Sequence, residues 1–174
     1  MKKLIFAASY IVLAAVSLSS VARAQENPAA INSKLVQIVR SSTAQYQNVG
    51  NATAAGYGPF LGCVSGSDHG AMGIHYVNPT LLNGTLDPTK PQALIYEPSN
   101  GQLSLVGVEF IVDAATWFKN NSSSPVLEGQ TLLYVDSPNR YNIPPFFELH
   151  VWAWRSNPMG SFMDWNDNVS CAGQ

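Results

Sequence analysis

The residues best able to do chemistry gather in two short stretches of the 174-residue chain, which between them hold all three histidines. His69 and His75 lie in a glycine-rich stretch, and His150 lies in an aromatic one, two residues after Glu148. On a β-strand, residues two apart point to the same face, so Glu148 and His150 are neighbours. An imidazole and a carboxylate in an apolar setting cost free energy unless they have partners. The pattern therefore indicates a site, formed by side chains from several strands.

A further carboxylate, Glu109, interrupts the apolar run Leu105–Val112. Two imidazoles and a carboxylate supply three ligands and leave an open position, a pattern typical of zinc, copper or non-haem iron. The predicted site comprises His75, Glu109 and His150 as metal ligands, His69 as a fourth candidate ligand, and Glu148 as an orienting carboxylate or general base. The sequence thus predicts an exported metal-binding protein, with a mononuclear metalloenzyme as one form of it.

Three alternatives stay open at this point. The histidines and glutamates can satisfy one another inside a structural core, or they can form a metal-free acid–base site. A metal-free binding module is the third alternative, with a small apolar or sugar ligand in an aromatic pocket formed by Trp117, Trp152, Trp154 and Trp165. The sequence contains no nucleophile elbow, phosphate loop, dinucleotide fingerprint or Cys-x-x-Cys-His motif.

The N-terminus has the pattern of a signal peptide covering residues 1–24. Lys2 and Lys3 precede an apolar run, and Ala22-Arg23-Ala24 fits a cleavage site, so we expect a periplasmic or secreted protein beginning near Gln25. Removing this segment leaves six basic residues against eleven acidic ones, a net charge of about −5, which argues against nucleic acid as a partner. No later stretch predicts a membrane span. In an oxidising compartment, the two cysteines, Cys63 and Cys171, are expected to form a disulfide.

The elements expected to position the site make one α+β domain over residues 25–174. A long helix over 28–49 should pack on a curved, largely antiparallel sheet or small β-barrel. The predicted strands are 73–77, 93–97, 103–112, 129–135 and 146–154, with residues 60–68 as a connector. Asn100-Gly101 predicts a hairpin turn. A regular ladder from that turn pairs Glu109 with Gln92 and places Glu109 on the face of Leu94 and Tyr96.

The stretches His69-Gly70-Ala71-Met72-Gly73-Ile74-His75 and Glu148-Leu149-His150-Val151-Trp152-Ala153-Trp154 resemble those of an uncharacterised family of small secreted, mainly bacterial proteins. Most of the chain after residue 24 takes part in the resemblance. It implies a secreted single domain and carries no activity with it.

Overall fold

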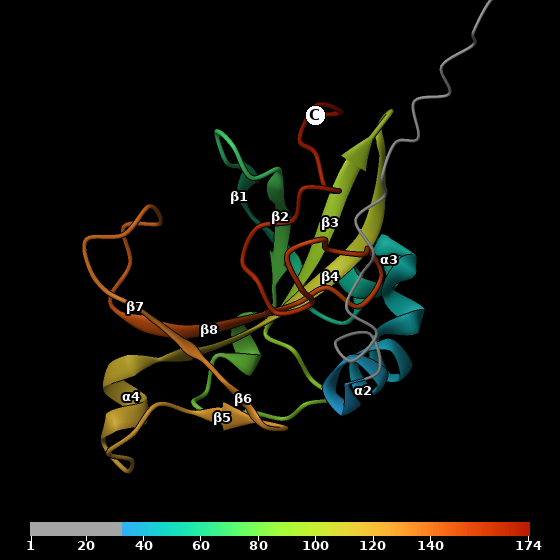
Figure 1. The fold of residues 1–174 in the computed structure, drawn as a ribbon. Helices are drawn as coiled ribbons and strands as arrows, with labels where there is room; N and C mark the ends of the chain where they lie inside the picture. Colours follow the sequence, from blue (N-terminus) through green and yellow to red (C-terminus); the bar gives the residue numbers. More distant parts are fainter. Residues whose placement is uncertain (1–32) are drawn as a thin grey trace, which may run out of the picture.

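The computed structural model describes residues 33–174 (Figure 1). The predicted signal peptide and the first part of the predicted helix, 28–32, lie outside the described residues. Within 33–174, no helix combines the length and the apolar character needed to cross a membrane. A few short helices accompany a six-stranded antiparallel sheet that curls into a half-barrel, so the α+β prediction is confirmed at this level.

The predicted long helix is divided into three short pieces: α2 (Lys34–Thr43), η1 (Ala44–Gln47) and α3 (Val49–Ala54). Ser33 begins α2, because its side-chain oxygen accepts a hydrogen bond from the N–H of Val36. Asn48 interrupts the helical run: its backbone is extended, and its side chain accepts a hydrogen bond from the N–H of Gly50 and caps α3. The single helix was therefore wrongly predicted through Asn48, a residue type that caps helices better than it continues them.

The sheet has the spatial order β1-β2-β3-β4-β8-β7, and every neighbouring pair is antiparallel. Its strands are β1 (Gly58–Ser65), β2 (Ala71–Val77), β3 (Ala93–Ser99), β4 (Gln102–Asp113), β8 (Phe146–Val151) and β7 (Leu133–Val135). The connections contain η2 (Pro79–Leu81), α4 (Ala114–Phe118) and a two-stranded ribbon of β5 (Val126–Leu127) and β6 (Gln130–Thr131).

Two sequence predictions fail at the sheet edges. Much of the expected connector 60–68 belongs to β1, an edge strand that is mostly exposed and shifts register after Phe60, where Leu61 has a positive φ. Such a strand has no hydrophobic alternation to reveal it. The expected strand 129–135 is split between β6 and β7, because buried Leu132 leaves the strand and donates its N–H to Pro125.

A β-bulge in β4 decides which way its second half faces. Next to the turn the predicted register is confirmed, with Ser99 opposite Gln102 and Glu97 opposite Ser104. The register then shifts: Tyr96 pairs with Leu105 but Ile95 pairs with Gly107, which leaves Val106 as the extra residue.

The shift turns Glu109 to the face opposite the one predicted for it. Glu109 pairs with Ala93, not with Gln92, and shares its face with Gly107 and Ile95. The predicted regular ladder was therefore wrong beyond Val106. A one-residue shift moves every later side chain to the other face of the sheet.

The two faces of the sheet have different roles. One face packs against α2, η1 and α3 and forms the main hydrophobic core, with Leu94, Tyr96, Val108, Phe110, Val112, Phe147, Leu149 and Val151 from the strands. The opposite face, called the site face below, carries His75, Glu109 and His150.

The C-terminal segment leaves β8 and returns over β2. Asn166 forms an isolated bridge with Ala71, and the predicted disulfide joins Cys63 to Cys171. The turn after Val151 separates two tryptophans that a longer strand would have placed together. Trp152 joins a second buried cluster, while Trp154 packs on the main core and donates its indole N–H to Thr43. The strand predicted over 146–154 ends at Val151, so Trp152 and Trp154 do not share one face of it.

Candidate metal centre

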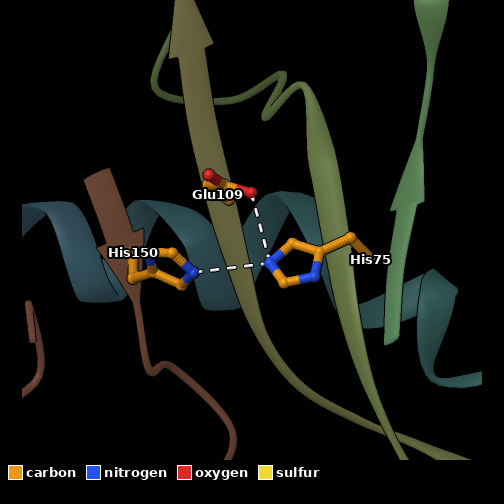
Figure 2. Close-up of side chains that lie close together, drawn as sticks. All are labelled: His75, Glu109 and His150. Carbon is orange, nitrogen blue, oxygen red and sulfur yellow. Dashed lines mark hydrogen bonds and ion pairs between the residues drawn. The ribbon is translucent and has the colours of Figure 1, made fainter. Parts of the chain in front are cut away.

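Strands β2, β4 and β8 bring His75, Glu109 and His150 together on the site face (Figure 2). Glu109 and His150 are direct cross-strand partners. His75 approaches from β2, across β3, where Ile95 pairs with His75 and Ala93 pairs with Glu109. His75 and Glu109 therefore lie diagonally opposite each other across β3.

The ligand atoms of these residues form a tight, buried triangle. His75 Nε2 lies 3.4 Å from His150 Nε2 and 3.3 Å from Glu109 Oε2. All three atoms lie within 4.8 Å of one another, and the residues are only 4%, 4% and 0% exposed for His75, Glu109 and His150. Buried polar groups at this density need a common partner, either protons or a cation.

Two of the three edges of this triangle, those that meet at His75 Nε2, have the length expected for a tetrahedral metal site, and the third is longer. In a tetrahedron the distance between two ligands is about 1.63 times the bond length, so bonds of about 2.0–2.1 Å give edges of about 3.3–3.4 Å. The two separations from His75 Nε2 match these edges. The two histidines and Glu109 thus offer three ligands at the spacing of one ion, with a fourth position left for another group.

Without an ion, the same atoms hold protons. Burial, followed by the charge of His150, lowers the pKa of His75 to about 3, so His75 is neutral. Burial acts to lower the pKa of His150 too, but Glu109, Asp164 and Glu148 outweigh it and raise this pKa to about 9. A cationic His150 therefore faces a neutral His75 across the 3.4 Å contact.

Glu148 lies beside Glu109, and the two carboxyl groups share a hydrogen bond. Burial raises the pKa of Glu109 well above its usual range and raises that of Glu148 as well. Both carboxyl groups therefore hold a proton more readily than exposed glutamates do. Glu148 is 4% exposed, and its Oε2 has no hydrogen-bond partner within the described chain. The structure thus places this predicted carboxylate at the cluster, with one oxygen still able to accept a proton or a ligand.

A second group of possible ligands, Glu148, His150 and Asp164, shares His150 with the first. Asp164 Oδ1 lies 3.6 Å from His150 Nδ1, slightly too far for a hydrogen bond. An imidazole whose Nδ1–H faces a carboxylate presents the lone pair of Nε2 to the other side. Because His150 Nε2 is the atom that faces His75, we interpret Asp164 as the group that orients His150 toward the first triangle.

The fourth predicted ligand, His69, belongs to neither group and is exposed. It ends the loop after β1, where Gly70 has a φ of 67° and its backbone lies directly against Asn166. This contact fixes the path of the chain into β2 with His69 on the outside. The prediction that glycine flexibility lets His69 reach the site does not hold in the structure.

A cavity of about 680 Å³ opens on the site face and reaches His75 and Glu109. The rest of its lining is mainly apolar and aromatic: Tyr57, Pro59, Phe60, Val77, Pro79, Leu82, Ile111, Tyr141, Ile143 and Phe146, with Thr53, Gly56 and Gly58. Burial, followed by the charges of Glu109 and Glu148, raises the pKa of Tyr141, so its hydroxyl stays protonated and donates to Met72 Sδ at 3.6 Å.

The pocket predicted from the tryptophans is not the one that the structure forms. None of the four tryptophans lines the cavity. Trp152 stacks on His150 with ring centroids 6.0 Å apart, and Trp165 lies under the Arg140 guanidinium at 4.8 Å. Trp117 donates its indole N–H to the Ser123 carbonyl. These indoles pack within the fold, and Trp152 also contacts the candidate ligand His150. The aromatic lining of the cavity comes instead from Tyr57, Phe60, Tyr141 and Phe146.

Sequence reasoning missed Asp164 and Tyr141. Both lie in loops without periodicity, and only the turn residues around them mark these segments. A weak signal existed for Asp164, because it lies beside Trp165 in a tail otherwise poor in charge.

No family model, curated protein or solved structure matches the chain. The resemblance to a family of secreted proteins therefore stays a prediction, and functional conclusions depend on the geometry of the chain's own residues.

Proposed function

We propose that this chain is an exported metal-binding protein in which His75, Glu109 and His150 hold one divalent transition metal ion. The observation that carries the proposal is the buried triangle of Nε2, Nε2 and Oε2 atoms with separations of 3.4 and 3.3 Å. These are the ligand spacings of a four-coordinate zinc or copper ion. Octahedral iron with bonds of about 2.1 Å would need cis edges of about 3.0 Å and a small contraction of the cluster.

Export is supported by the disulfide between Cys63 and Cys171, since such bonds persist mainly in oxidising compartments. The signal-peptide pattern of residues 1–24 points the same way.

The surroundings of the triangle support a reactive site more than a purely structural one. A structural zinc ion is normally closed by four protein ligands, whereas a catalytic site keeps an open position. Here the cavity gives access to His75 and Glu109, and Glu148 has a free oxygen nearby. A bound ion would supply a Lewis acid or a redox centre. Glu148 would accept or return a proton beside it, the role predicted for this residue.

A metal-free alternative is favoured by one observation. The 3.4 Å contact joins a histidine with a raised pKa to one with a lowered pKa, so a single proton can satisfy both rings. In that case the cluster stabilises the core or serves as an acid–base site without any ion.

Elemental mass spectrometry of the untagged protein, purified from its native compartment, separates these functions. We expect about one zinc, copper or iron ion per chain, lost in His75→Ala and in His150→Ala. His69→Ala is the matched control, because it removes an exposed imidazole outside the cluster and should keep the full metal content. Circular dichroism must show that every variant is folded. A wild-type protein that is metal-free and takes up none of the three added ions would refute the proposal.

A further inference from the structure

We infer that the cavity binds a neutral aromatic molecule that carries one oxygen or nitrogen donor, with the donor directed at the open position of the metal site. This inference rests on the proposed function and names the class of ligand for the same site. The size of the cavity, its aromatic wall and the charges of the metal-ligand groups beside it support this assignment.

The cavity has the dimensions of a small-molecule site. Its volume of about 680 Å³ lies inside the range of about 300–1,000 Å³ that accommodates ligands of drug-like size. Such sites are mostly apolar and have a few convergent polar groups that fix the orientation of the ligand. The two buried polar groups in this lining, His75 and Glu109, are also two of the three proposed metal ligands. A molecule that fills the cavity therefore lies directly against the metal site.

Three aromatic rings form one wall of the cavity. Tyr141 lies between Phe60 and Phe146, with ring centroids 6.3 Å and 6.1 Å away, and the ring planes are tilted by 45° and 58°. Tilted rings at this spacing present both edges and faces, which favours another aromatic ring over a sugar hydroxyl array. The tyrosine hydroxyl is engaged with Met72. This wall therefore offers the ligand ring contacts in preference to hydrogen bonds.

The charges at the floor favour a neutral ligand. Among the residues that line the cavity in the described part of the chain, there is no lysine or arginine. Three carboxylates, Glu109, Glu148 and Asp164, belong to the metal-ligand groups, so a divalent ion with neutral imidazoles leaves a formal charge of −1 on these groups. Arg140, which lies outside the cavity lining, offsets this charge in part. A carboxylate or phosphate ligand would meet this negative charge in a desolvated place, where like charges repel strongly.

The test compares three probes of similar size: 2-naphthol, which has a neutral donor, 2-methylnaphthalene, which has none, and 2-naphthoate, which is an anion. Binding to the metal-loaded and metal-free protein is followed by titration of intrinsic fluorescence. We expect 2-naphthol to bind at least ~10-fold more tightly to the loaded form, a difference typical of one added coordination or charge-assisted contact. For 2-methylnaphthalene we expect equal affinity in both forms, and for 2-naphthoate the weakest binding of the three.

A pair of variants ties the binding to the cavity. Ile143→Trp adds an indole inside the cavity, and it should weaken binding of both neutral probes at least ~10-fold while metal content stays at one ion per chain. Val126→Trp adds the same bulk at a position that is 60% exposed and outside the cavity, and should change nothing.

The outcomes distinguish failure of the inference from failure of the proposed function. A protein that holds its ion but binds no neutral probe, or binds 2-naphthoate best, overturns the inference and leaves the metal site standing. Equal binding of 2-naphthol to both forms would overturn the inference that the donor atom of the ligand contacts the ion. If no ion is taken up, the proposed function and this contact are both refuted. Binding of 2-methylnaphthalene then shows whether the cavity takes an aromatic ligand, and absence of binding refutes that part as well.

Discussion

Metal uptake by this protein should release protons, and its affinity for the ion should therefore rise with pH. The ion and the protons compete for the same lone pairs, because His150 is protonated in the metal-free form and burial favours protonation of Glu109 and Glu148. A lower pH favours the protonated ligands and weakens metal binding, whereas a higher pH removes the protons and strengthens it.

The size of the effect follows from the pKa values. His150 has a pKa of about 9, which is about two units above pH 7, so an ion that binds at pH 7 must displace the His150 proton. At pH 7 this competition makes the affinity for the ion ~100-fold weaker, or ~2.7 kcal/mol less favourable, than with His150 deprotonated. His75 has a pKa of about 3 and has no proton to lose. Release of the His150 proton alone should make the affinity rise about 10-fold per pH unit from about pH 6 to 8.5, and any proton lost from Glu109 or Glu148 makes the rise steeper.

Two measurements give the proton count independently. Competition with a chromogenic chelator of known pH dependence gives the affinity across this pH range, and a pH-stat titration in weakly buffered solution counts the protons released at pH 7. We expect at least about one proton per ion, the one held by His150. His69→Gln is the control, since it removes an exposed histidine and should leave the count unchanged.

Release of less than about half a proton per ion at pH 7 would refute the reasoning. It would mean either that His150 is already neutral or that the ion binds elsewhere. An unchanged count in His150→Gln would establish the second of these.

Three further predictions concern stability. Replacing Cys63 and Cys171 by serine opens a loop with a sequence separation of 108, which should cost about 4–5 kcal/mol in the chain-entropy model; urea unfolding with and without reductant measures it. Gly73→Ala should lower the free energy of unfolding by at least ~2 kcal/mol in the same assay, because the new Cβ would lie 2.7 Å from a backbone oxygen of β3. The control Gly101→Ala also lies at positive φ but in open space, so it should lower the free energy of unfolding by only ~1 kcal/mol. Compared with His75→Gln, the metal-free wild type should lose stability as the pH falls from about 6.5 toward 3, since only the unfolded chain protonates His75 there. The difference between the two proteins should reach ~2.7 kcal/mol by pH 4.5.

The hairpin and the chemistry-bearing residues could be predicted from sequence because the signals are local. Asn100-Gly101 fixed the register as far as Glu97 opposite Ser104. The choice of His75, Glu109 and His150 rested on a simple energetic rule, that ionisable groups in apolar strands need partners.

What could not be predicted depends on contacts between distant residues. The bulge at Val106 is marked in the sequence only by the adjacent Gly107, which does not fix the register by itself. It is stabilised from far along the chain, by the N–H groups of Trp154 and Arg155 that donate to the Val106 carbonyl. Without that shift, Glu109 would lie in the main core with Leu94 and Tyr96, away from the histidines. The register of β4 and the position of Asp164 therefore required the folded structure.

The distribution of the ligands over three strands has a consequence for the order of events during maturation. His75 and His150 are 75 residues apart in sequence, so the ligand set does not exist until β8 has paired with β4, a slow, non-local step. An unfolded chain offers only scattered single ligands. If the protein is exported and binds an ion, as proposed, the apoprotein folds first, with protons in place of the ion, and the ion enters afterwards through the cavity, the side on which His75 and Glu109 are reached. Occupancy of the site would then be set by the metals available in the destination compartment, not by those at the place of synthesis.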